Sequence, residues 1–230
     1  MVIENLQNTF LTLIAIAAGI AAFAGIFLLE SFFRNKLKEL FEDTNYLISF
    51  FLVAGYFLYA LGEVSFYLMR VVFQMESPTG IQDVYWSGGA ILILISFLAL
   101  TMALFRQKRE ISTLGIMAGL GAVLLILVLL LVPSGTFFTR FYPIISALIV
   151  TFASSAILFR SRLGNWAQPI QLFFLASCAI LLGDVFFGSA TAAGGYGLMG
   201  MAADVFYLLG YSASAVAFIT FRRQFHKAAL

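Results

Sequence analysis

The sequence predicts an all-α membrane protein with seven membrane-spanning helices, and three observations indicate this fold class. The chain of 230 residues is 62% hydrophobic and 10% charged, with a mean hydropathy of +1.02, whereas a soluble domain carries about 25% charged residues. Its apolar segments are long enough to cross about 30 Å of hydrocarbon. Its basic residues cluster in alternate connections. Because lipid cannot satisfy backbone polar groups, we expect each span to be a helix.

The apolar segments follow one another with short connections, so we expect a single membrane domain over residues 1–230. The longest polar connection covers 34–45, and no segment is large enough to form a domain outside the membrane. The predicted spans are 9–33, 46–73, 82–105, 112–133, 137–159, 167–188 and 198–221.

The distribution of basic residues predicts the orientation. With seven spans, eleven of the thirteen lysines and arginines fall on one side, and only Arg70 and Arg140 fall on the other. Because positive charge is concentrated in cytoplasmic loops, we expect the N-terminus outside and the C-terminus inside, in a prokaryotic plasma membrane. No basic patch indicates nucleic-acid binding, so the expected partner is the lipid bilayer. The eleven residues are Arg34, Lys36, Lys38, Arg106, Lys108, Arg109, Arg160, Arg162, Arg222, Arg223 and Lys227.

The two ends of the chain resemble each other. A shift of 121 residues places Leu61-Gly62-Glu63-Val64 on Leu182-Gly183-Asp184-Val185, and Asp83 on Asp204. The offset is four spans, so both halves have the same orientation, and sites in transporters with such repeats lie at the repeat interface. Chance similarity between apolar segments is the alternative, but matched acids inside spans are rare. The predicted halves are about 9–105 and 137–221, joined by the linker helix 112–133.

Four acids inside the spans form the centre of the predicted site. A charged side chain at the bilayer centre costs at least about 2.5–3.5 kcal/mol on insertion scales, and such a residue indicates function by default. All four are expected in the outer half of the membrane, where Arg70 and Arg140 are the available counter-ions. The alternative is a structural role, in which the acids stabilise the N-termini of helices or only bond neighbouring helices to one another. The four acids are Glu63, Asp83, Asp184 and Asp204.

Aromatic residues accompany these acids. Tyr56, Tyr59 and Glu63 are spaced by three and four residues, which places them on one helix face. An outward-opening polar pocket is therefore expected, and an interfacial aromatic belt is the alternative. The aromatic residues predicted to bind a ligand or ion are Tyr56, Tyr59, Trp86 and Tyr207.

Residues suited to metal or covalent chemistry are scarce. The one histidine, His226, lies in the C-terminal tail, and the one cysteine, Cys178, lies in an apolar run. Haem ligation, a zinc hydrolase and a Cys/His nucleophile therefore have no support, and we expect neither a metal nor a cofactor. Enzymatic activity has no positive signal, although paired aspartates alone can do acid–base work.

The last span resembles the corresponding helix of the microbial opsins. In Asp204-Val205-Phe206-Tyr207-Leu208-Leu209-Gly210-Tyr211, the aspartate, valine and Gly-aromatic positions match the opsin stretch whose acidic counter-ion precedes the retinal lysine. The resemblance implies an opsin-like fold. However, Leu208 stands at the lysine position and all four lysines lie outside the spans, which excludes a retinal Schiff base. Leu181-Leu182-Gly183-Asp184 is similar to lysoplasmalogenase-type membrane proteins, but that family's downstream histidine is lacking.

Three functions fit this pattern. The first is a receptor-like or sensory protein that binds a small cationic ligand and acts through a membrane partner or a homo-oligomer. The second is a transporter or channel for protons or small cations, with Glu63 and Asp184 as paired sites. The third is a structural subunit of a membrane complex, in which the acids bond neighbouring helices.

Overall fold

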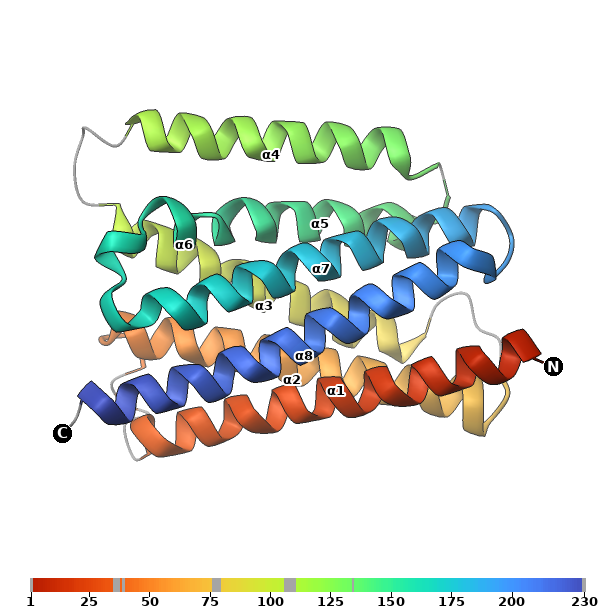
Figure 1. Cartoon of the computed structure of the whole chain (residues 1–230), viewed down its shortest axis with the longest axis horizontal. Helices are drawn as coiled ribbons and strands as arrows, with labels where there is room; N and C mark the ends of the chain where they lie inside the picture. Colours follow the sequence, from red (N-terminus) through yellow and green to blue (C-terminus); the bar gives the residue numbers. More distant parts are fainter. Residues whose placement is uncertain are drawn as a thin grey trace.

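The computed structural model of the chain confirms the prediction of seven spans. It describes residues 2–34, 38, 40–75, 80–105, 111–133 and 135–228. Within these ranges it is all-helical without strands, and seven helices are long and apolar enough to cross a membrane. The two chain ends lie at opposite ends of the bundle (Figure 1). Several residues used for the orientation lie outside the described side chains, namely Lys36, Arg106, Lys108, Arg109 and Lys227, as does His226.

The helices are longer than several of the predicted spans. One begins seven residues earlier and two end several residues later, because a helix continues beyond the hydrocarbon whereas an apolar segment ends at its first polar residues. The elements are α1 (Val2–Phe33), α2 (Thr44–Tyr67), a π-helical turn η2 (Leu68–Val72), α3 (Ile81–Leu104), α4 (Ile111–Leu131), α5 (Phe137–Ala153), α6 (Ser155–Leu158), two 3-10 turns η4 (Arg160–Arg162) and η5 (Gly164–Trp166), α7 (Ala167–Ala192) and α8 (Gly197–Ala228).

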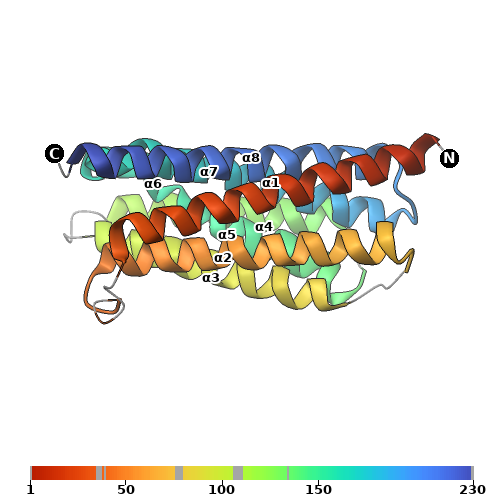
Figure 2. The same cartoon turned by 90° about the horizontal axis from the view of Figure 1, so that it is seen from below.

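Six of the spanning helices form a ring, and α4 lies outside it. Around the ring, α1 packs on α2, α2 on α3, α3 on α5, α5 on α7, α7 on α8, and α8 on α1. Figure 2 shows α1 crossing between α8 and α2. Helix α4 packs chiefly on α5, along one edge of the bundle (Figure 1). The interior of the ring therefore lies between six helices that come from both ends of the chain.

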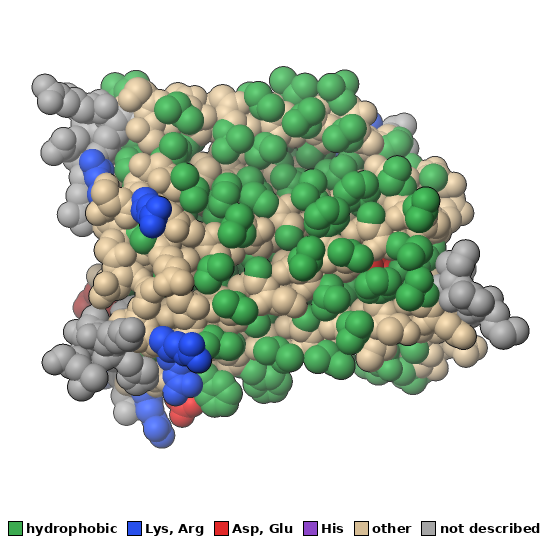
Figure 3. Space-filling model, in the orientation of Figure 1, with side chains coloured by type: hydrophobic (Ala, Val, Ile, Leu, Met, Phe, Trp, Pro, Cys, Tyr) green, Lys and Arg blue, Asp and Glu red, His purple; other side chains and the backbone are tan. Residues whose placement is uncertain are grey.

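The outer surface of the bundle has the character of a surface that faces lipid. Figure 3 shows hydrophobic side chains spread over the middle of one face, while lysine and arginine side chains gather at the end where the chain terminates. Large apolar side chains such as Phe23, Leu130 and Met102 are exposed on α1, α4 and α3. Such surface needs a hydrocarbon solvent, so the chain is an integral membrane protein.

Glycines let the helices around the site approach closely. A Cβ atom on Gly89 of α3 would lie 2.8 Å from the carbonyl oxygen of Gly55 on α2, and one on Gly210 of α8 would lie 2.7 Å from Cγ1 of Ile180 on α7. Small residues at membrane helix interfaces allow such close backbone approach. The helix pairs α2–α3 and α7–α8 are therefore fixed at short distances, which positions the side chains between them.

Candidate functional site

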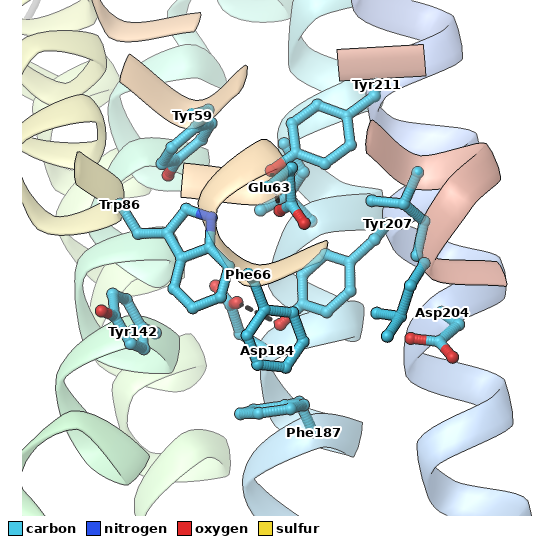
Figure 4. Close-up of a pocket in the computed structure, with 13 residues that line it drawn as sticks. Tyr59, Glu63, Phe66, Trp86, Tyr142, Asp184, Phe187, Asp204, Tyr207 and Tyr211 are labelled. Carbon is cyan, nitrogen blue, oxygen red and sulfur yellow. Dashed lines mark hydrogen bonds between the residues drawn. The ribbon is translucent and has the colours of Figure 1, made fainter. Parts of the chain in front are cut away.

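A small cavity lies inside the ring, toward the end of the bundle where the chain begins. Its volume of about 60 Å³ corresponds to about two water molecules, since one water takes about 30 Å³ in the liquid. Figure 4 shows the side chains around this inner cavity. It is lined by Leu11, Ile14, Tyr59, Glu63, Phe66, Trp86, Tyr142, Ile180, Asp184, Phe187, Asp204, Tyr207 and Tyr211.

A larger hollow of about 730 Å³ adjoins the inner cavity. Gln7 near the start of α1, Thr136 before α5 and Tyr196 before α8 contribute to its wall, so this outer hollow lies at the end of the bundle where the N-terminus is. Six residues line both spaces, which makes them the neck between the two, namely Leu11, Phe66, Trp86, Tyr142, Phe187 and Asp204.

The carboxylate of Asp184 uses both of its oxygens within the protein. Tyr207 of α8 donates a hydrogen bond to Oδ1 at 2.7 Å, and Ser146 of α5 donates one to Oδ2 at 2.5 Å. The side chain of Asp184 is 8% exposed. Asp184 on α7 therefore ties three helices of the ring together.

The carboxylate of Glu63 uses only one oxygen. Tyr211 of α8 donates a hydrogen bond to Oε1 at 2.7 Å, which joins α8 to α2. The second oxygen, Oε2, accepts no hydrogen bond from the described residues, although Glu63 is 9% exposed. The indole of Trp86 lies beside Glu63 (Figure 4), but its nitrogen has no hydrogen-bond partner in the described part of the chain.

Asp204 and Asp83 also differ in whether one or both of their carboxylate oxygens accept a hydrogen bond. Asp204, at the neck, accepts a hydrogen bond from the Tyr196 hydroxyl on Oδ2 and has no described partner on Oδ1. Asp83 accepts the Gly80 N–H on Oδ2 and the Tyr142 hydroxyl on Oδ1, both at 2.8 Å. Asp83 therefore caps α3 and holds α5, while Asp204 keeps one oxygen for the cavity.

Each of the two deeper acids follows a glycine that is covered by an aromatic ring. A Cβ atom on Gly183 would lie 2.7 Å from Cε1 of Tyr207, and one on Gly62 would overlap the indole ring of Trp86. Gly62 and Gly183 are 121 residues apart, as are Trp86 and Tyr207. The glycines thus allow the two rings to lie against the backbone beside the acids.

The two predicted tyrosines of α2 lie at different depths. Tyr59 is 6% exposed and lines the inner cavity, and its hydroxyl has no hydrogen-bond partner among the described residues. Tyr56 is 1% exposed and does not line the cavity. Its ring packs on Phe173 and Phe218, with centroids 5.8 and 5.5 Å away. These three rings close the core below the cavity.

The two arginines of the predicted site lie at the outer hollow and on the surface. The Arg70 guanidinium lies 6.0 Å from the ring centroid of Phe66, and Arg70 lines the outer hollow. Arg140 is exposed on α5. In the described part of the chain, the donors to the four acids are tyrosine and serine hydroxyls and one backbone N–H. The counter-ion role of both arginines stays a prediction.

Sequence reasoning missed several residues of the site. Ser146 and Tyr196 carried no signal, because each bonds its acid across a distance that no spacing along the chain reveals. Phe66 and Phe187 could have been found, since each follows an acid by three residues and the pair is 121 residues apart. Among the described residues, no group of three His, Cys, Asp or Glu side chains is placed to hold a metal ion.

Comparisons with known proteins add no family to this geometry. No family model matches the chain, and neither a curated protein nor a solved structure matches it. The likeness to opsins and lysoplasmalogenases therefore rests on the quoted residues and stays a prediction. What the chain itself establishes is an integral membrane protein with seven apolar helices.

Proposed function

We propose that the protein is receptor-like: it binds a small cation in the inner cavity and passes the signal to a membrane partner or a second copy of itself. One observation carries this proposal, namely that the described residues lining the inner cavity include three acids and no lysine, arginine or histidine. Carboxylates buried without a counter-charge are costly. A bound cation supplies that charge.

We also propose that the cavity faces the outside of the cell. The charge pattern of the connections favours an external N-terminus, and the outer hollow lies at the N-terminal end. The concentration of basic side chains at the opposite end in Figure 3 supports the same orientation. A ligand would then enter from outside through the neck.

The closed floor of the cavity favours binding over passage. Tyr56, Phe173 and Phe218 are each no more than 1% exposed, and the Phe173 and Phe218 ring centroids are 4.7 Å apart. Protein interiors are packed to the density of organic crystals, so a cation does not cross this layer without a rearrangement.

A transporter is the second candidate, and the internal repeat supports it. Two contacts between a glycine and a side chain of the neighbouring helix recur at an offset of 121 residues. The contact of Gly89 with Tyr59 corresponds to that of Gly210 with Ile180. The contact of Gly62 with Trp86 corresponds to that of Gly183 with Tyr207. The pairs α2–α3 and α7–α8 correspond likewise. Parallel repeats that rock against each other around a site are a known transport architecture.

Flux and stability measurements separate the two functions. The chain is placed in proteoliposomes, and proton and monovalent-cation flux is compared for the wild type, Glu63→Gln and Asp184→Asn. The receptor-like function predicts no flux above that of empty liposomes, together with cation-dependent thermal stabilisation that Glu63→Gln removes. Flux that depends on Glu63 would establish the transporter instead. Glu30→Gln is the matched control, because Glu30 is exposed and lies 3.9 Å from Arg34, outside the cavity.

A third outcome tests the proposal as a whole. If neither flux nor cation-dependent stabilisation is found for the folded wild type, the acids serve only to bond helices. The structural-subunit function then replaces both candidates.

A further inference from the structure

We propose that the cation bound by the inner cavity is a primary alkylammonium ion. Its ammonium group donates hydrogen bonds to Glu63 and Tyr59, and its alkyl part lies against the aromatic wall that includes Trp86. This inference rests on the proposed function, and it specifies the chemical class of the ligand.

The unused hydrogen-bonding capacity of the site indicates an N–H donor. Asp184 has donors on both oxygens, whereas Oε2 of Glu63 has none among the described residues. The Tyr59 hydroxyl is also without a described partner, although Tyr59 is 94% buried and lines the same cavity. Both oxygens can therefore accept a hydrogen bond from a group in the cavity. A primary ammonium offers three N–H donors to such acceptors.

Glu63 and Tyr59 line the same cavity from one helix. They are four residues apart on α2, which puts both on one face of the helix. The Tyr59 ring packs edge-to-face on Tyr211, with centroids 6.1 Å apart, and the Tyr211 hydroxyl holds Glu63. Both side chains lie near Trp86 in Figure 4.

The walls of the cavity favour an organic cation over a bare metal ion. Trp86 and Phe66 lie with ring centroids 5.4 Å apart, and Phe187 continues this wall into the neck. Aromatic faces attract ammonium groups by about 0.5–2 kcal/mol each and also bury the attached carbons. The cavity volume of about 60 Å³ has room for the ammonium end of the ligand, and the neck leads from there to the outer hollow.

Asp204 at the neck gives such an ion a first contact. Its Oδ1 has no described partner and it lines both the outer hollow and the inner cavity. A carboxylate in a narrow entrance concentrates cations there and raises their association rate. Asp204 therefore acts on entry, and Glu63 holds the ion inside.

Tryptophan fluorescence reports directly on this cavity. The chain has two tryptophans, and Trp166 packs on Phe221 at 4.5 Å, away from the site. In a Trp166→Phe background, Trp86 is the only tryptophan. The full chain is reconstituted in nanodiscs and titrated with propylammonium, butylammonium, tetramethylammonium, sodium and propan-1-ol.

We expect saturable changes in Trp86 emission with propylammonium and butylammonium. Propan-1-ol has as many non-hydrogen atoms as propylammonium but no charge, and tetramethylammonium has the charge without N–H donors; each should bind at least about tenfold more weakly than propylammonium. Glu63→Gln should weaken propylammonium binding at least about tenfold, and Tyr59→Phe by roughly fivefold. Glu30→Gln should leave it unchanged.

The other outcomes overturn the inference in distinguishable ways. If sodium gives a signal that depends on Glu63 and propylammonium gives none, the ligand class is wrong while the proposed function stands. Tetramethylammonium binding as tightly as propylammonium would remove the role of N–H donors. If no cation gives a signal that depends on Glu63 or Tyr59 in the folded protein, the proposed function fails as well. Tyr59→Phe keeps the test valid if Glu63→Gln does not fold.

Discussion

Glu63 of α2 and Asp184 of α7 occupy corresponding positions, yet the protein uses them differently. Each follows a glycine that is covered by an aromatic ring of the next helix. Asp184 has a hydroxyl donor on each oxygen, whereas Glu63 has a donor on one oxygen and leaves the other toward the cavity. Similar local surroundings therefore hold one acid that joins helices and one that is available to a ligand.

The difference comes from what faces each acid across the ring. Ser146 of α5 supplies the second donor to Asp184. Beside Glu63 stands Trp86, whose nitrogen lies outside hydrogen-bond geometry with any described acceptor. A single hydroxyl on a neighbouring helix thus decides whether a carboxylate has a structural role or an open oxygen.

The largest expected effect separates these two roles by stability. Asp184→Ala leaves the hydroxyls of Ser146 and Tyr207 without their acceptor, so we expect a loss of about 2–4 kcal/mol in the free energy of unfolding. Glu63→Ala leaves only the Tyr211 hydroxyl, with an expected loss of about 1–2 kcal/mol. Equilibrium unfolding in detergent micelles measures both. Asp184→Asn is the control, because its amide keeps an acceptor and should cost less. An equal loss for both alanine variants would contradict the comparison.

The next effect tests the glycines that the two acids share. Gly183→Ala and Gly62→Ala each introduce a Cβ atom against a ring, Tyr207 in one case and Trp86 in the other. Overpacking of this kind costs about 1–3 kcal/mol, so we expect similar losses in thermal unfolding. Only Gly62→Ala should also shift Trp86 emission. Gly115→Ala is the matched control, because a Cβ atom on Gly115 has nothing within 4 Å.

The sequence predicts the spans well and the roles of the acids poorly. Hydropathy reveals all seven helices, because the cost of unsatisfied backbone in lipid leaves few alternatives. The acids inside the spans identify Glu63, Asp184 and Asp204, which line one cavity in the structure. The packing of Tyr56 was less predictable. It shares a helix face with Glu63 but lies two turns deeper, where Phe173 and Phe218 cover it.

What the sequence lacked was the identity of hydrogen-bond partners between distant helices. Ser146 and Asp184 are 38 residues apart, and Tyr211 and Glu63 are 148 apart. Such pairs depend on how the ring closes and on the rotation of each helix. Spacing along one helix fixes neither quantity, so the sequence did not reveal the hydroxyls that bond the acids in the described part of the chain.

A smaller effect is expected from the tyrosine that bonds Asp184. Tyr207→Phe removes one of the two donors and keeps the ring on Gly183. We expect a loss of about 1 kcal/mol in the free energy of unfolding, with the Ser146 hydrogen bond intact. Thermal unfolding of Tyr207→Phe, Ser146→Ala and the double variant measures the coupling of the two donors. Strict additivity of the two single losses would argue against a shared carboxylate.

The smallest effect lies at the entrance, in the segment between α7 and α8. Tyr196 stands among Gly194 and Gly197, whose φ values are +76° and +29°, and its hydroxyl bonds Asp204. A Cβ atom on Gly200 would lie 2.5 Å from Cδ2 of Tyr196, so this glycine lets the ring lie over the start of α8. Tyr196→Phe should cost under about 1 kcal/mol globally but should raise hydrogen exchange of the segment.

This segment also gives a pH test. Burial, with the hydrogen bond to Asp204 as a second cause, raises the pKa of Tyr196 above its ordinary value of about 10. The folded form therefore holds the proton more tightly than the unfolded form. The stability that Tyr196 contributes is fully present below its pKa in the unfolded form. It is lost as the pH rises toward its pKa in the folded form. Exchange in the wild-type segment, corrected for intrinsic rates, should increase above about pH 10, whereas Tyr196→Phe should show no such rise. A parallel rise in both proteins would mean that Tyr196 does not hold this segment.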